Sequence, residues 1–162
     1  MIAVFAFFAL AVTGCNPGQK LPEGMPPLTP CTLTITQDGK PLEGATISLF
    51  SIGGAQSFYP GGKTDANGKA EIFTNGKYQG VPDGKYKVVV SKRETEESKF
   101  GPALTADDPG YDEWLAKSSG ENLSSYRLVE KQYTSAGTTT LEITVPGEIA
   151  TLDVGKAIRE KL

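Results

Sequence analysis

Few residues in this chain could do catalytic chemistry, because its 162 residues include no histidine. Without imidazole there is no Ser-His-Asp or Cys-His catalytic pair and no zinc site that uses histidine. The two cysteines are Cys15 and Cys31. Cys31 has no histidine to activate it, so we interpret it as a small buried residue and not as a nucleophile. We therefore expect a protein that is not an enzyme and has no cofactor.

Cys15 follows an uncharged apolar run over residues 1–13. The run has the length of the hydrophobic part of a signal peptide and is too short to span a bilayer comfortably. It ends in Val12-Thr13-Gly14-Cys15, which resembles the lipobox of bacterial lipoproteins. The resemblance implies that residues 1–15 are a lipoprotein signal peptide and that Cys15 is the lipidation site. A Cys15–Cys31 disulfide is the alternative that remains open.

Carboxylates are the other groups that could bind or react. Asp65-Ala66-Asn67-Gly68 offers oxygen ligands that suit calcium, but Asn-Gly between two strand patterns is already explained as a tight turn. A second acidic group consists of Asp107, Asp108, Asp112 and Glu113. We interpret it as solvated charge with helix capping and expect no metal site. Paired carboxylates could also run a hydrolase, but none lies in an aromatic-rich context.

A short helix is expected around the only tryptophan. Asp108 is the predicted N-cap, Pro109 the first helical residue, and acidic residues fill the first turn. Trp114 and Leu115 would form its packing face. We favour a Trp114 that fixes the segment to the rest of the domain; the alternative is a stacking role, with Tyr111, Trp114 and Asp112 as candidate ligand-binding residues.

The elements that would position these residues are β-strands. Apolar residues alternate with polar ones over 32–36, 45–50 and 140–145, and residues 148–154 are a further candidate strand. We expect the first two strands to form a hairpin and the next two, within residues 63–73, to meet at Asn67-Gly68. Residues 80–91 contain a Pro-Asp-Gly turn that leads into a central strand with Tyr86, Val88 and Val90 inward. About seven short strands separated by turns predict an all-β sandwich.

Three turn motifs occur in order in this region: Asp38-Gly39-Lys40-Pro41-Leu42, Thr64-Asp65-Ala66-Asn67-Gly68, and Val81-Pro82-Asp83-Gly84-Lys85-Tyr86. They resemble the transthyretin-like, carboxypeptidase-regulatory-like β-sandwich over about residues 31–92. The resemblance implies a prealbumin-like, Ig-like Greek-key sandwich. For function it implies only a spacer or binding module, because such domains accompany many activities.

The expected organisation is a signal peptide over 1–15, a proline-rich tether over 16–30, a sandwich over 31–155 with an insertion at about 92–135, and a tail over 156–162. The net charge of −3 is dispersed, which disfavours nucleic acid as a partner. We expect a non-catalytic binding or scaffold module of the cell envelope, lipid-anchored to the outer membrane or cell surface, with an envelope protein or polysaccharide as partner. The alternatives are a carbohydrate- or metal-binding accessory protein to a secreted hydrolase, and a hydrolase in its own right.

Overall fold

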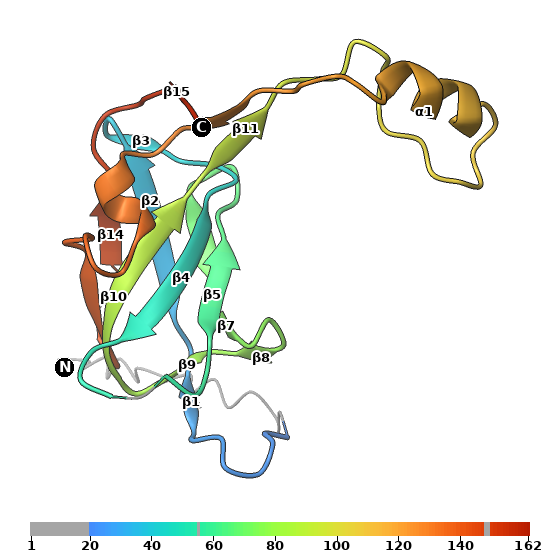
Figure 1. The fold of residues 1–162 in the computed structure, drawn as a ribbon. Helices are drawn as coiled ribbons and strands as arrows, with labels where there is room; N and C mark the ends of the chain where they lie inside the picture. The colour runs from blue at the N-terminus through green and yellow to red at the C-terminus, as the bar shows by residue number, and fades with distance from the viewer. Residues whose placement is uncertain (1–19, 55, 148–149) are drawn as a thin grey trace, which may run out of the picture.

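The computed structural model describes residues 20–54, 56–147 and 150–162 and shows an all-β sandwich with one helix (Figure 1). The all-β prediction is therefore confirmed. The predicted signal peptide, including Cys15, lies outside the described residues. Within the described ranges, no helix has the length and apolar character needed to cross a bilayer.

Six strands form the first sheet, in the order β13-β10-β4-β5-β7-β8. Their bounds are β4 Thr46–Ser51, β5 Pro60–Lys63, β7 Phe73–Thr74, β8 Tyr78–Gln79, β10 Gly84–Ser91 and β13 Glu142–Val145. The eight-residue strand β10 pairs antiparallel with β4 on one side and β13 on the other. This confirms the predicted central strand, and its inward residues Tyr86, Val88 and Val90 are buried.

The second sheet is built around β2 (Thr32–Gln37). One edge of β2 pairs in parallel with β14 (Ala150–Asp153), and the other pairs antiparallel with β6 (Lys69–Glu71) and β3 (Lys40–Pro41). The inward faces of the two sheets supply one core. Its fully buried members include Leu33, Ile35, Ile47, Leu49, Ile72, Val88 and Val90. Burying each such side chain contributes about 1.5–3 kcal/mol, so this core is the main source of stability.

The predicted hairpin between residues 32–36 and 45–50 is wrong, because β2 and β4 lie in different sheets. The hairpin is instead formed by β2 and β3, with Gln37 opposite Lys40. Its two central residues, Asp38 and Gly39, have φ of 51° and 70°. Positive φ at both positions is the conformation of the type I′ turn that joins tightly paired strands.

The turn at Asn67-Gly68 is present, but its flanking strands do not pair with each other. β5 pairs with β4 in the first sheet, whereas β6 pairs with β2 in the second. The turn therefore carries the chain from one sheet to the other. Gly68 has φ of 72°, and its N–H donates to the carbonyl of Asp65.

The folded region is longer at both ends than the sequence predicted. β1 (Leu28–Thr29), within the predicted tether, pairs with β9 (Val81–Pro82). β15 (Glu160–Lys161), within the predicted tail, pairs with β12 (Ser125–Arg127). Both predicted segments lack the alternation that marks a strand, because these strands are only two residues long.

The insertion is also shorter than residues 92–135. The 3₁₀ helix η1 (Lys131–Thr134) packs beside β10, and Val129 just before it is completely buried. The Thr139 hydroxyl donates to the carbonyl of Val88, which ties the end of this segment to the central strand. Residues 128–139 therefore belong to the sandwich.

We predict that Gly68→Ala destabilises the protein more than Gly39→Ala. Both glycines have φ near 70°, so both alanines incur the left-handed backbone cost of about 1–2 kcal/mol. At Gly39 an added Cβ meets nothing within 4 Å, whereas at Gly68 it would lie 2.4 Å from the Ile35 carbonyl oxygen. The overpacking should cost about 1–3 kcal/mol more. Equilibrium denaturation measures the free energy of unfolding of both variants. Equal losses of stability would show that the contact with the Ile35 carbonyl oxygen is easily relieved.

Candidate functional site

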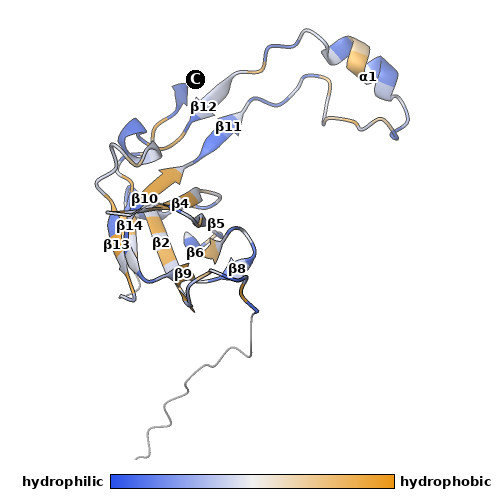
Figure 2. Ribbon diagram, turned by 60° about the horizontal axis from the view of Figure 1, so that its bottom comes forward, coloured by the Kyte–Doolittle hydropathy of each residue, from blue (hydrophilic) through white to orange (hydrophobic). Residues whose placement is uncertain are grey.

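A long extension projects from one end of the sandwich (Figures 1 and 2). β11 (Arg93–Thr95) pairs antiparallel with β12. Residues 96–124, called the arm below, connect these two strands and carry helix α1 (Tyr111–Ser118) at their far end. In Figure 2, β10 and β2 are largely hydrophobic, whereas β11 is hydrophilic. None of the described residues of the arm belongs to the buried core of the sandwich.

The base of the arm is a three-stranded sheet in the order β11-β12-β15. The guanidinium of Arg159, just before β15, lies 3.5 Å from the centroid of the Tyr126 ring. Its Nε is also 3.5 Å from a carboxylate oxygen of Glu94. A cation over an aromatic face is attracted by the negative electrostatic potential that the quadrupole of the ring creates there. These contacts join all three strands and fix where the arm leaves the sandwich.

Two glutamates hold the arm's two chain segments together. Glu96 accepts hydrogen bonds from the Tyr126 hydroxyl at 2.6 Å and the Ser124 N–H at 3.1 Å. Glu121 accepts from the Ser98 hydroxyl at 2.6 Å and the following backbone N–H at 2.9 Å. In each case the side-chain hydrogen bond, followed by the backbone one, holds the pKa of the carboxyl below its usual value. Both carboxylates serve as structural acceptors.

Helix α1 begins at Tyr111 and not at the predicted Pro109. Gly110 precedes it with φ of 85° and supplies no side-chain cap. Asp108, the predicted N-cap, instead accepts hydrogen bonds from the N–H and the hydroxyl of Thr105, at 2.7 and 2.8 Å. These two bonds lower the pKa of Asp108. An aspartate can close a turn on its N-terminal side as readily as cap a helix, so the sequence pattern was ambiguous.

The structure brings two of the three candidate ligand-binding residues together. Tyr111 and Trp114 are one helical turn apart, with ring centroids separated by 6.4 Å and planes inclined by 26°. Asp112 is exposed and is one and two positions away from them, a spacing at which helix side chains do not face each other. The aromatic pair is thus a surface feature of α1, and Asp112 lies beside it without joining it.

The prediction that Trp114 fixes the segment to the sandwich is wrong. Trp114 is half-buried, but it lines an open hollow of about 430 Å³ whose other walls all come from the arm, chiefly Phe100, Leu104 and Lys117. Its indole Nε1 is buried without a hydrogen-bond acceptor among the described residues. Sequence could identify Trp114 as aromatic but could not show which surface it covers.

Sequence reasoning missed the other apolar residues of the arm. Phe100, Leu115 and Leu123 are 43%, 44% and 41% exposed, and α1 has no buried residue. Leu115 was expected to help pack α1, but Phe100 and Leu123 lie in segments with no periodicity. The sequence did contain one indication of their exposure: they are isolated apolar residues in a long segment that lacks the periodicity of a buried helix or strand. Their exposure leaves the arm with an apolar surface that is not packed against the sandwich.

The arm is also strongly acidic. Residues 96–124 contain seven acidic and two basic side chains, a net charge of −5, whereas the whole chain carries −3. One of the two lysines, Lys117, pairs with Glu113 at 2.6 Å. Within the described structure, the side chains of Glu97, Asp107 and Asp112 have no hydrogen-bond or ion partner. The arm thus combines exposed apolar groups with uncompensated negative charge.

Asp65, the first residue of the loop considered for calcium, closes the turn at Asn67-Gly68. Its Oδ1 accepts hydrogen bonds from the N–H groups of Asn67 and Lys69, at 2.8 and 2.9 Å, which closes the turn. Over residues 20–54, 56–147 and 150–162, no three acidic or cysteine side chains gather as a metal site would require.

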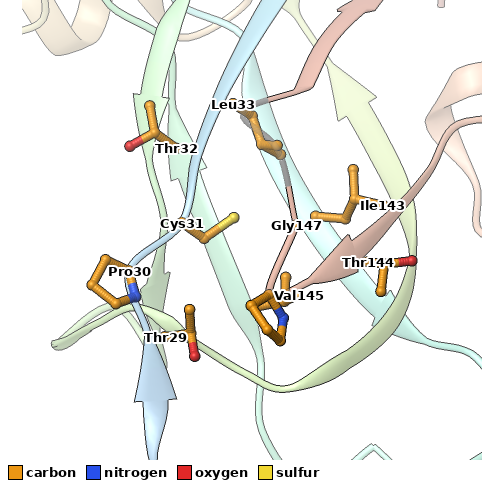
Figure 3. Close-up of a pocket in the computed structure, with 10 residues that line it drawn as sticks. Thr29, Pro30, Cys31, Thr32, Leu33, Ile143, Thr144, Val145 and Gly147 are labelled. Carbon is orange, nitrogen blue, oxygen red and sulfur yellow. The ribbon is translucent and has the colours of Figure 1, made fainter.

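Cys31 lies at the start of the second sheet and is half-buried as a free thiol. Figure 3 shows its sulfur directed into the space between Leu33, Ile143 and Val145, in a hollow of about 80 Å³. Burial raises the pKa of this thiol, so the thiolate needed for nucleophilic attack is disfavoured. Cys15, its candidate disulfide partner, lies outside the described residues.

Comparisons of the chain with protein-family models, with curated proteins and with solved structures found no match.

We predict that Trp114→Ala changes the stability of the sandwich little. A buried tryptophan would cost about 3–5 kcal/mol on truncation, but Trp114 has no sandwich neighbour, so we expect a loss of less than about 1 kcal/mol. Val129→Ala is the matched control, because Val129 follows the arm and is fully buried; its loss should be about 2 kcal/mol. Denaturation curves in which Trp114→Ala costs as much as Val129→Ala would contradict this placement.

We predict that acid loosens the arm. Because the folded-state pKa of Glu96 is lowered, its contribution is fully present above the ordinary glutamate value and is lost as pH falls through the folded value. Tyr126→Phe removes the main cause of the shift, so the pKa of Glu96 should rise toward its ordinary value. NMR titration of the carboxyl carbons measures this change. Glu121, which has its own partners, is the internal control and should titrate unchanged.

Proposed function

We propose that this protein is a non-catalytic binding or scaffold module, attached to a membrane of the cell envelope by a lipid on Cys15. In this proposal the β-sandwich is a transthyretin-like spacer and the arm is the part that binds. The observation that carries the proposal is the arm itself, which leaves the sandwich with exposed apolar side chains and a net charge of −5. The chemistry of the sequence supports the absence of catalysis, since no histidine is present to act as a base.

The surface of the arm specifies the chemistry of its partner. Trp114, Leu115 and Phe100 offer apolar and aromatic contact area, which is the usual centre of a protein interface. The unpaired carboxylates elsewhere on the arm, Glu97, Asp107 and Asp112, call for Lys and Arg on the partner, because complementary potentials steer association and fix orientation. We therefore propose that the partner is an envelope protein with an apolar groove bordered by basic residues.

The aromatic pair on α1 also fits a second kind of partner. Tyr111 and Trp114 could also stack on a sugar ring, so a polysaccharide is retained as an alternative that the experiment must distinguish.

The experiment is capture from detergent-solubilised envelope with the full chain expressed behind its own leader. Wild type should partition into the detergent phase, and Cys15→Ser should not, because it cannot accept the lipid. Leu115→Ser, Trp114→Ala and the double charge reversal Asp107→Lys, Asp112→Lys should each reduce retention of the partner at least tenfold. Leu162→Ser is the matched control, since Leu162 is also a large exposed apolar residue but lies outside the arm.

Cross-links from the arm should map to a basic, apolar groove of the captured protein, and retention should weaken as salt screens the charges. Equal partitioning of wild type and Cys15→Ser would overturn the lipid anchor. Retention that survives all three arm changes, or that maps to the sandwich, would overturn the arm as binding site. Retention of a glycan in place of a protein would favour the polysaccharide alternative.

A further inference from the structure

The end of the sandwich opposite the arm exposes a second set of large side chains. Tyr59, Ile52 and Phe50 are 66%, 40% and 36% exposed. Phe50 lies near the end of β4, Ile52 follows that strand, and Tyr59 immediately precedes β5. Figure 1 places this end beside β1, β8 and β9, and the arm leaves from the other end. We call these residues and their neighbours the anchor-side end.

The chain that enters the anchor-side end adds to its apolar surface. Residues 20–27 form a loop below β1, closed by a hydrogen bond of 3.1 Å from the Met25 N–H to the Pro22 carbonyl (Figure 1). Leu21 and Met25 in this loop are only half-buried and are not among the side chains packed against the core. Both side chains therefore add apolar surface to this end of the sandwich.

Three lysines, Lys20, Lys77 and Lys85, are exposed at the anchor-side end, beside the exposed carboxylates of Glu23 and Asp83. The Nζ of Lys77 lies 5.3 Å from the centroid of the Tyr78 ring. Of the nearby carboxylates, Asp83 accepts a hydrogen bond of 2.7 Å from the Thr29 hydroxyl. Lysines beside tyrosines and aliphatic side chains are typical of a membrane interface, where the rings enter the headgroup layer and the ammonium groups remain at the phosphates.

The segment between Cys15 and Lys20 is too short to hold this end far from a bilayer in which a lipid on Cys15 is inserted. Five peptide units separate Cys15 from Lys20, and a fully extended chain of that length spans at most about 18 Å. A lipid on Cys15 therefore keeps Lys20 within about 18 Å of the membrane surface. The loop over residues 20–27 lies on the anchor-side end, so this end is the part of the sandwich nearest to the headgroups.

We propose that the anchor-side end rests on the lipid surface, with Ile52, Tyr59 and Tyr78 in the interfacial layer and Lys77 and Lys85 at the lipid phosphates. The inference rests on the proposed lipid anchor. It adds a second, direct contact of the folded domain with the bilayer. The contact orients the domain, so that the acidic arm is directed away from an anionic surface that would repel it.

The test uses the lipidated full chain in vesicles of phosphatidylethanolamine and phosphatidylglycerol that contain doxyl-labelled lipid as a fluorescence quencher. The native chain has one tryptophan, Trp114, which reports from the arm. The double variant Tyr59→Trp, Trp114→Phe moves that single reporter to the anchor-side end. Tyr59 is exposed, so the substitution should leave the fold intact. We expect quenching of the double variant to be severalfold steeper than quenching of the native chain.

Charge reversal provides a second measurement. Lys77→Glu with Lys85→Glu, added to the double variant, should reduce the quenching severalfold, whereas Lys131→Glu with Lys156→Glu, at exposed positions elsewhere, should leave it unchanged. Equal and weak quenching of both reporters on vesicle-bound protein would overturn the membrane contact and leave the anchor intact. Lipidated protein that fails to remain on vesicles would instead overturn the anchor.

Discussion

The pairing of β10 along both edges is the constraint on which the rest of the structure depends. With β4 on one side and β13 on the other, this strand cannot shift its register without moving Tyr86, Val88 and Val90 out of the core. The chain continues from β10 through Lys92 directly into β11, and the Leu128 N–H donates to the Lys92 carbonyl at the junction. The direction of the arm is therefore set by the most firmly held strand of the sandwich.

The polar groups of the arm do structural work that sequence alone could not assign. Glu96, Asp108 and Glu121 each accept two hydrogen bonds from nearby donors, and each has a lowered pKa for that reason. Lowered values keep these carboxyls ionised, which is the opposite of what a general acid at neutral pH requires. These hydrogen bonds hold the arm together without a hydrophobic core, so apolar side chains such as Phe100, Leu115 and Leu123 remain exposed.

Sequence was sufficient for features that depend on neighbouring residues and insufficient for those that depend on distant ones. Alternation identified the buried faces of Leu33 and Ile35 and of the β10 residues, and glycine at position 68 identified a tight turn, because both are local effects. The sequence of β2 does not indicate which strand it pairs with, because Leu33 would be buried equally well beside β4 or β6. Trp114 shows the same limit at the candidate site: its type was clear, but Phe100 and Leu104, which line the same hollow, lie ten or more residues away along the chain.

The opposite placement of the loop over residues 20–27 and of α1 bears on how strong the interaction must be. An eight-residue strand spans about 26 Å, so β10 alone holds the arm at a fixed height above the end where the chain enters. If the protein is anchored by a lipid as proposed, it would meet a partner in the same bilayer by diffusion in two dimensions, at a constant height above the membrane, and not in three. Confinement to one surface would raise the effective concentration of the two proteins, provided that the height of the arm matches the height of the partner's binding site. An interaction too weak to detect between the two proteins in solution would then be sufficient.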